Sequence, residues 1–457
     1  MMRTRSLAAE AAPMSRDALE ALATRAIKLS HADGAQVDVR SGVSGNTRFA
    51  VNELSTAGDV SDATISVTSA FGPKRASVST NDLSDEGVRT VVSQSEQLAK
   101  LAPDDPEAMP AFGPQQYQTI EAYFESTARV SAKERAEAAL TALEPARAAR
   151  GIGLMAAGFV VTGESASVTA NKAGLSAFFR STSANYTLTV RTADGTGSGW
   201  AAADDHDWTK LDPKAVAERA IEKAQRSRNP IRLEPGRYTV ILEPQAVGDL
   251  VQLVQGELDA RSADEGRSAF VRASGGSKVG ETIADSRVTL FSDPADPQLR
   301  SAPYDGEGFP VGRQVWIENG VLRELSYSRF WAKKQGKEYK GQSGSLKLIG
   351  GPTSRQEMIK STERGVLVTR LWYLREVDPR TILYTGLTRD GTFLIEHGEI
   401  TKSIRNFRFN DSPLFLLNNL DALGPVERLA GTEGSGDVAM PILKARDFDF
   451  TSLSDAV

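Results

Sequence analysis

The stretch Arg237–Glu265, RYTVILEPQAVGDLVQLVQGELDARSADE, joins two local patterns at a single corner. Alternation and β-branched residues predict a strand from Arg237 to Glu243. Pro244 follows, and proline suits the first turn of a helix, where a missing N–H costs nothing. Apolar residues then recur at helical spacing and predict one buried face: Ala246, Val247, Leu250, Val251, Val254 and Leu258. A strand therefore enters a helix through a tight corner, which is a common place for catalytic side chains.

This corner resembles the metal-site segment of the TldD/PmbA family of metallopeptidases. In TldD-type members the segment reads His-Glu-Ala-Val-Gly-His, in which the histidines hold a metal and the glutamate is the general base on metal-bound water. Here it reads Pro244-Gln245-Ala246-Val247-Gly248-Asp249. Proline has no side-chain donor atom, and an amide cannot take a proton from water at neutral pH.

The third metal ligand of the family is a cysteine in a Gly-Thr-Cys-Gly run near the C-terminus. The corresponding run here is Gly431-Thr432-Glu433-Gly434. The ligand and base positions are thus occupied by Pro244, Gln245, Asp249 and Glu433, a pattern that resembles the PmbA (TldE) subunit type. The resemblance implies no catalytic residue, no metal and no other cofactor in this chain, with zinc expected only in a TldD-type partner.

The length of 457 residues favours two or three domains over one. We expect an α+β protein with an N-terminal α/β domain over 1–112 and a middle α+β domain over 113–232, both built of antiparallel strands and helices. A larger, β-rich domain over 233–457 would carry the strand–helix corner. Ala102–Pro114 has four prolines and several acidic residues, which is typical of a linker or domain edge.

Composition narrows the class of partner. The chain is 40% hydrophobic and 25% charged, with a net charge of −5 and both signs interspersed, which argues against direct binding of nucleic acid. No stretch approaches the roughly 20 apolar residues that span a bilayer, and the N-terminal residues lack the apolar core of a signal peptide. The absence of cysteine excludes disulfides and thiolate sites and fits the cytoplasm.

The first two units combine helical patterns with strands. Helices are predicted over 15–29, 84–101, 131–143 and 212–227, with Ser15 as the first N-cap. Strands with turns between them are predicted over 35–45, 46–58 and 62–83, and an antiparallel meander over 151–208. His31 is interpreted as a residue at a helix end, and the run Asp204-Asp205-His206-Asp207 as a solvated loop.

Two segments of the third unit echo each other as hairpins, RQVWIENGVLRELSYSRF and GTFLIEHGEITKSIRNFRF. Asn319-Gly320 predicts a type I′ turn, and His397-Gly398 occupies the equivalent place, so His397 is interpreted as a turn residue. Between the hairpins, Lys333–Arg355 is rich in Gly, Lys and Ser and predicts a long mobile loop beside the corner.

Three further runs resemble PmbA-like members: 375–379 (REVDP), 388–391 (TRDG) and 406–413 (NFRFNDSP). The resemblance extends from about Gly34 to Phe448. Arginine and aspartate at strand ends can pair and lock a corner, the interpretation we favour, or can hold a peptide backbone. The candidate substrate-binding residues are Arg375, Asp378, Arg389, Asp390, Asn406, Arg408 and Asn410.

The resemblance implies a non-catalytic subunit that pairs with a TldD-type metallopeptidase and helps it cleave unfolded polypeptides, bound here as an added β-strand. A homodimer is the alternative assembly. One alternative function is a peptidase in its own right, with Glu243, Asp249 and Glu433 holding a hard cation such as Mg²⁺. The other is a non-enzymatic protein-binding regulator, in line with the family's older description as modulators of DNA gyrase.

Overall fold

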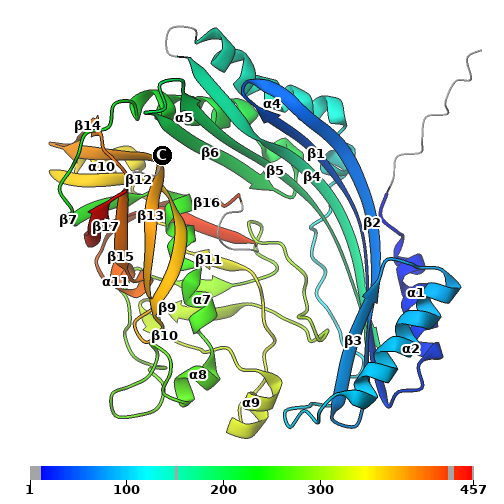
Figure 1. Cartoon of the computed structure of the whole chain (residues 1–457). Helices are drawn as coiled ribbons and strands as arrows, with labels where there is room; N and C mark the ends of the chain where they lie inside the picture. The colour runs from blue at the N-terminus through cyan, green and yellow to red at the C-terminus, as the bar shows by residue number, and fades with distance from the viewer. Residues whose placement is uncertain (1–11, 150–152, 431–436, 455–457) are drawn as a thin grey trace, which may run out of the picture.

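An antiparallel sheet of long, curved strands forms one side of the molecule (Figure 1). The computed structural model describes residues 12–149, 153–430 and 437–454. Within these residues the strand order of the sheet is β3-β2-β1-β4-β5-β6. The strand bounds are β1 Gly34–Ala50, β2 Glu53–Phe71, β3 Lys74–Thr80, β4 Leu154–Asn171, β5 Ser176–Thr192 and β6 Ser198–Asp205.

Four helices pack on one face of this sheet, and the opposite face turns toward the rest of the chain (Figure 1). They are α1 Arg16–Leu29, α2 Asp85–Leu101, α4 Ala132–Ala148 and α5 Pro213–Arg226, with the short α3 Glu125–Ala128 and η1 Trp208–Lys210 nearby. Each of the four begins at a side chain that accepts a backbone hydrogen bond, namely Ser15, Ser84, Ser131 and Asp212. The four predicted helices are thus confirmed. No helix in the described ranges is long and apolar enough to cross a membrane.

The predicted turn inside 35–58 is wrong. β1 runs without interruption through Gly42 and Gly45, and the chain reverses only at Val51 and Asn52, both with positive φ. Gly45 makes room for another element, because a Cβ there would lie 2.3 Å from Nη1 of Arg135 on α4. The sequence pattern thus predicts a turn at Gly45, whereas this glycine is required for close packing.

The two expected N-terminal units share the sheet. β1, from the unit expected over 1–112, pairs with β4, from the unit expected over 113–232, at residues 36–49 and 158–171. The segment between α2 and α3 contains no strand within the described residues and crosses between these two parts. Residues 34–205 consequently supply one continuous layer, and the chain then passes through α5 to the third unit.

Five strands of the third unit pair in a closed ring, in the cyclic order β7-β12-β13-β15-β17. They are β7 Gly236–Leu242, β12 Arg364–Asp378, β13 Leu383–Glu396, β15 Phe407–Asp411 and β17 Val438–Leu453. Further strands extend the sheet: β8 Leu290–Ser292, β9 Gln314–Glu318, β10 Val321–Leu322, β11 Leu346–Leu348, β14 Glu399–Ser403 and β16 Leu420–Arg428. The helices of this unit are α6 Pro244–Val251, α7 Leu253–Glu257, α8 Ala260–Asp264, α9 Arg329–Gln335, α10 Arg355–Lys360 and α11 Pro413–Asn418.

Buried aromatic side chains fill part of the ring. The Phe407 and Phe450 rings stack with centroids 4.6 Å apart, Phe448 lies 5.1 Å from Phe450, and Phe409 lies 5.3 Å from Phe448. All four side chains are almost completely buried. Each pair adds roughly 0.5–1.5 kcal/mol to the stabilisation that burial alone provides. The cluster joins β15 to β17 and holds the two strands in register.

Several expectations for the third unit are confirmed and two are corrected. Asn319 and His397 have φ of 51°, as the hairpin turns require. The helix predicted from Pro244 is instead divided at Gln252 into α6 and α7. The predicted loop over 333–355 contains β11, in which Leu346 pairs with Val438 of β17. The glycine and serine residues on either side of this short strand favour a loop, so the local sequence does not predict it. The strand forms because it pairs with a strand that is distant in sequence.

Asp411, at the end of β15, is a carboxyl group inside this packing. Its side chain is only 4% exposed, and its two oxygens accept hydrogen bonds from Asp449 N at 3.0 Å and Ser412 N at 2.7 Å. Burial raises the pKa of Asp411 from the usual 3.8 to about 6, because the two backbone donors only partly offset the loss of hydration. Ionisation of this group therefore opposes folding.

This raised pKa predicts a pH-dependent loss of stability. The contribution of Asp411 is fully present below its unfolded pKa and is lost as the pH rises through about 6. We expect Asp411→Asn, which cannot ionise, to remove on the order of 2 kcal/mol from the fall in unfolding free energy between about pH 4.5 and about pH 7.5. Urea unfolding measures it. Asp378→Asn is the control, since the Arg380 backbone N–H lowers the pKa of Asp378. An undiminished fall in Asp411→Asn would contradict the prediction.

Candidate functional site at the strand–helix corner

The corner between β7 and α6 is held from two sides. Glu243 is the N-cap of α6, with extended backbone, and its N–H donates to Val368 O of β12 at 3.0 Å. Pro244 occupies the first helical position, as predicted, and every residue of α6 after it is buried. The first turn of α6 is therefore fixed against β12, directly after the parallel pairing of β7 with that strand.

Asp249 anchors α6 to β12. Its side chain is fully buried; Oδ2 accepts from Leu371 N at 2.9 Å, and Oδ1 accepts from Gln245 Nε2 at 3.1 Å. A carboxylate in such a place needs hydrogen-bond donors to offset the loss of hydration. Gln245, one turn earlier on the same helix, supplies one donor, and the strand supplies the other. Both residues at these positions thus have structural partners.

Glu243 bridges three elements. Its Oε2 lies 2.5 Å from Lys223 Nζ of α5, and its Oε1 lies 3.3 Å from Arg355 Nε of α10. Lys223 also donates to Trp200 O of β6 at 3.2 Å. The carboxylate is largely buried, so two cations neutralise it where hydration is weak. This ion pair connects the helix layer of the N-terminal sheet to the corner.

The residues of the corner do not fit a metal. Pro244 offers no donor atom, the Gln245 amide faces Asp249, and both oxygens of Asp249 accept hydrogen bonds from protein groups. Glu243 is bound by two cations, whose charge would repel a metal ion. Among the described residues, no three His, Asp or Glu side chains are arranged to hold a metal. Glu433, the remaining candidate, lies outside the described residues.

A cavity of about 310 Å³ opens beside the first turn of α6. Apolar side chains from both sheets and from the segment after β16 line it: Trp200, Phe393, Ile400, Leu429 and Ile442. Charged side chains also line it: Arg219, Glu222, Lys223, Arg226, Glu243, Arg355, Glu427 and Arg428. The cavity at the junction between the two layers therefore has a mixed apolar and charged lining, which can receive one side chain of a larger ligand.

The run Asp204–Asp207 is built into the junction, so its interpretation as a solvated loop is wrong. Asp204 accepts from Arg428 Nε at 2.6 Å, and Arg428 also binds Asp437. Burial acts against the charge of Arg428, but the two aspartates outweigh it and raise its pKa. His206 is 6% exposed and shares a 2.6 Å hydrogen bond with Thr182 O. These contacts join β6 to both ends of the segment that contains Glu433.

Three of the candidate substrate-binding residues lie together at the junction of the layers. Asp390 is 1% exposed and binds Arg370 Nε at 2.7 Å and Ser198 Oγ of β6 at 2.5 Å. Arg389, beside it, stacks over the Trp372 ring at 3.9 Å. Asn406 Oδ1 accepts from Thr392 Oγ1 at 2.8 Å and from Thr388 Oγ1 at 3.2 Å. The contact of Asp390 with Ser198 joins β13 to β6 of the N-terminal sheet, and Asn406 binds two threonines of β13.

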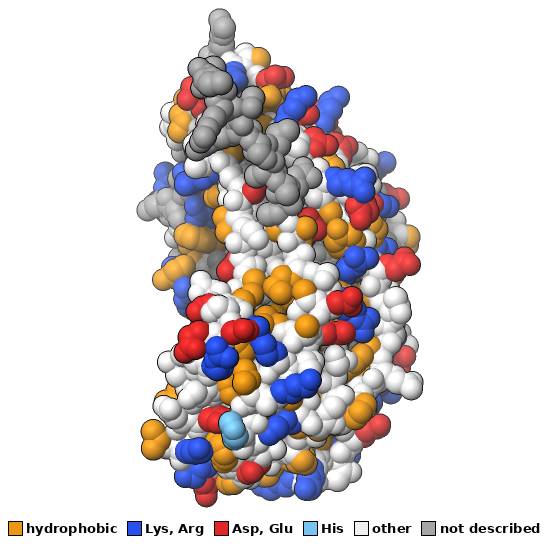
Figure 2. Space-filling view, turned by 90° about the vertical axis from the view of Figure 1, so that its right-hand side faces the viewer, with side chains coloured by type: hydrophobic (Ala, Val, Ile, Leu, Met, Phe, Trp, Pro, Cys, Tyr) orange, Lys and Arg blue, Asp and Glu red, His pale blue; other side chains and the backbone are white. Residues whose placement is uncertain are grey.

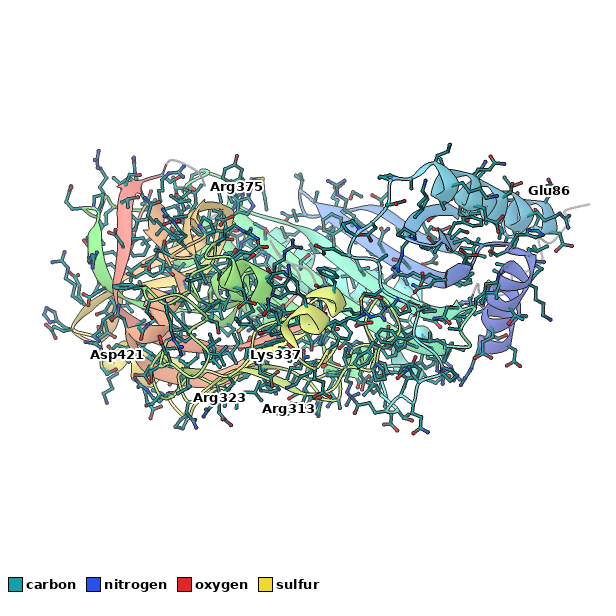
Figure 3. The ribbon with its side chains drawn as sticks, turned by 90° about the horizontal axis from the view of Figure 1, so that it is seen from below. Glu86, Arg313, Arg323, Lys337, Arg375 and Asp421 are labelled. Carbon is teal, nitrogen blue, oxygen red and sulfur yellow. The ribbon has the colours of Figure 1, made fainter. Side chains whose placement is uncertain are left out.

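The other four candidates lie on the outer part of the β12–β13–β15 region. Arg375 is exposed, with its guanidinium 4.2 Å from the Tyr373 ring, and Figure 3 places it far from Glu86 of α2. Asp378 accepts from Arg380 N at 3.1 Å within its own turn. Arg408 donates to Thr385 Oγ1 at 3.3 Å, and Asn410 is the strand neighbour of Thr385. The seven residues therefore form two groups and not one site.

Sequence reasoning missed the cations and the glycine that shape the corner. Lys223 and Arg355 are far from Glu243 in sequence, and no local pattern links them. The sequence draws attention to Gly248 because it lies in the Ala-Val-Gly run, but it does not indicate that the role of this glycine is steric. A Cβ at Gly248 would lie 1.9 Å from Leu429 Cδ1, so a larger residue here would require the Leu429 side chain to move away from α6.

Two models of one family match most of the chain. The model of the PmbA/TldA metallopeptidase central domain matches residues 125–228, and that of the C-terminal domain matches residues 235–452. A metalloprotease from Methanothermobacter thermautotrophicus is 29% identical over 252 residues, which are 50% of this chain and 52% of that protein. Metalloprotease PmbA from Escherichia coli O157:H7 is 24% identical over 151 residues, 32% of each chain. The chain spans about half the length of the archaeal metalloprotease it matches.

Two solved structures share the fold along almost the whole chain. TldE from Thermococcus kodakarensis superposes with a TM-score of 0.81 at 22% identity, covering 94% of this chain and 99% of that one. A Thermotoga maritima protein described as a modulator of a DNA gyrase gives a TM-score of 0.80 at 19% identity, with the same coverage. At such identities the likeness establishes the α+β fold.

The anchoring role of Asp249 predicts losses of stability of different size for two substitutions. Asp249→Ala leaves the buried Leu371 N–H without this acceptor and should cost about 2 kcal/mol of unfolding free energy. Asp249→Asn keeps an oxygen for Leu371 N and should cost less than about 1 kcal/mol. Urea unfolding followed by tryptophan fluorescence measures both. Equal stability of Asp249→Ala and the unchanged chain would contradict the anchoring role.

Proposed function

The chain belongs to the PmbA/TldD family of metallopeptidases, and from this premise we propose that it is a PmbA/TldE-type subunit without a catalytic metal. It would assemble with a TldD-type subunit that carries zinc, and the complex would cleave unfolded polypeptides. The observation that carries the proposal is the anchoring of Asp249 between Leu371 N and Gln245 Nε2. Asp249 stands at the position of a family metal ligand, but here it contributes to the packing of α6 on β12.

The rest of the corner supports the same proposal. A general base must accept a proton, and the Gln245 amide at the base position cannot do so. Glu243, the nearest carboxylate, is the partner of Lys223 and Arg355. These cations hold its side chain at the N-terminus of α6. The corner is therefore suited to a structural role and not to hydrolysis.

Substrate contact would come from the surfaces around the corner. The cavity beside α6 has a mixed apolar and charged lining, which fits one side chain of an extended polypeptide. Acidic and basic side chains are interspersed over the face shown in Figure 2, a distribution that does not favour nucleic acid as the ligand. Of the seven residues expected to bind substrate, the exposed set Arg375, Asp378, Arg408 and Asn410 stays a candidate surface for this contact.

The alternative is a peptidase in its own right, with a hard cation on Glu243, Asp249 and Glu433. The described members of that set have protein partners on both carboxylate oxygens. A cation would have to displace Lys223 and Arg355 from one carboxylate and break the anchor of α6 at the other. This cost weighs against the alternative.

The proposal predicts that the purified chain retains almost no metal. After loading with zinc and desalting, elemental mass spectrometry should find far less than one zinc per chain, because the described carboxylates of the corner already bind protein donors. Asp249→Asn should leave that value unchanged while the protein stays folded. Close to one metal per chain, lost in Asp249→Asn or Glu433→Ala, would instead support the carboxylate site.

The proposal also predicts that peptidase activity depends on a second chain. The isolated chain should not hydrolyse a fluorescent casein or other unfolded polypeptide, whereas its mixture with a co-purified TldD-type chain should. Zinc should be found in that second chain. Hydrolysis by the isolated chain would contradict the proposal. A co-purified partner of another kind, with no hydrolysis in the mixture, would favour the protein-binding regulator.

A further inference from the structure

The first part of β2 is an open edge of the N-terminal sheet. β1 pairs with β2 along its whole length, whereas β3 pairs only with residues 65–71. Among the described residues, no strand pairs with residues 53–64 on the side away from β1. Residues 53–62 are all exposed. Backbone N–H and C=O groups along this segment are therefore available to another strand.

This edge has few of the features that usually prevent strand pairing. Such edges are commonly blunted by proline, lysine, a bulge or a covering element. Residues 53–71 contain no proline, lysine or arginine, and the pairing with β1 is regular from Thr56 to Ala70. By contrast, β3 begins with Lys74 and Arg75. The open segment of β2 is thus long, and it is regular from Thr56 onward.

The opposite edge of the same sheet is covered. Ser198 of β6 binds Asp390, and Asp204 of β6 binds Arg428, so the third unit closes that side. Another strand could therefore be added to this sheet at β2 but not at β6.

Side chains beside the open edge suit an added strand. Leu54 and Val60 are 43% and 61% exposed. Val60 and Asp62 also line a groove of about 400 Å³ on the face of the sheet away from the helices, together with Ser165 and Ser181. A strand placed next to β2 would cover Val60 and extend this hydroxyl-lined surface. Backbone pairing combined with a few side-chain contacts is the usual form of β-strand addition.

The negative charge of β2 favours a basic segment as the added strand. The strand carries Glu53, Asp59 and Asp62 and no basic residue. Asp59 pairs with Arg135 of α4, whereas Glu53 and Asp62 make no ion pair within the described residues. We propose that the open edge of β2, residues 53–64, binds an extended, basic segment of another polypeptide as an added strand. This inference goes beyond the proposed function, because it requires neither a metal nor a catalytic partner.

A second copy of this chain fits the edge less well. Pairing β2 with β2 of another copy would bring Glu53 and Asp62 of both copies to one seam. Like charges on neighbouring strands oppose pairing. A segment with lysine or arginine would instead place opposite charges there, so charge complementarity favours another polypeptide over self-association.

Fluorescence anisotropy of a labelled peptide with the full chain tests strand addition directly. The probe is a synthetic peptide of about ten residues in which lysine alternates with valine. Two further peptides carry N-methyl groups on the odd or on the even amides, so one of them cannot donate to β2. We expect the parent peptide to bind saturably and one methylated peptide to bind about tenfold or more weakly. No saturable binding of the parent, or equal binding of all three, would overturn the proposal.

Two charge-matched variants locate the site. Asp62→Lys places a lysine on the edge, and Glu399→Lys makes the same charge change on β14 of the third unit, on the opposite side of the molecule in Figure 1. Both side chains are exposed, so thermal unfolding should be unchanged. We expect Asp62→Lys to weaken peptide binding about tenfold and Glu399→Lys to change it less than about twofold. Equal losses would overturn the proposal. A dimer in sedimentation that Asp62→Lys converts to a monomer would also overturn it, because the occupant would be a second copy.

Discussion

The pairing of β7 on both of its edges is the constraint on which the corner depends. Residues 239–242 pair with residues 365–368 of β12 in parallel, and the strand pairs with β17 in antiparallel orientation on its other edge. Because both edges are used, the end of β7 cannot move without opening the ring. The chain must leave the ring at Glu243, and Pro244 starts α6 at once. The anchor of Asp249 on Leu371, the packing of Gly248 on Leu429 and the cavity beside α6 all follow from that fixed exit.

Buried polar contacts span the junction between the two layers. The ion pairs of Lys223 with Glu243 and of Arg428 with Asp204 each join an element of the N-terminal layer to the third unit, and Ser198 of β6 donates to Asp390. Such pairs cost free energy to desolvate, but they have strict geometric requirements, so they specify one arrangement of the layers. A catalytic corner needs donors that remain free for metal and substrate. This corner uses its charged side chains to hold the layers together.

Local rules in the sequence predict much of the fold and little of the junction. Ser15, Ser84 and Ser131 mark helix starts because an N-cap is a contact between near neighbours. Asn319-Gly320 marks a hairpin for the same reason. Pro244, Gln245 and Asp249 lie in one short run, so the sequence also shows which residues stand at the corner. Three long-range contacts could not be predicted: Arg135 with Gly45, β11 with β17, and His206 with Thr182. Each depends on a partner more than 20 residues away that no period or spacing indicates.

The pairing of β1 with β4 has a consequence for how the chain folds as it is synthesised. β1 can pair with β2 soon after both have left the ribosome, but its other edge must wait until residue 171 has been made. The ring waits longer still, since β7 pairs with β17 near the end of the chain. Contacts between such distant segments form slowly, and each early strand carries an unpaired edge in the meantime. The nascent chain is therefore exposed to wrong pairing for most of its synthesis, and a chaperone that shields β1 would act at the most vulnerable stage of folding.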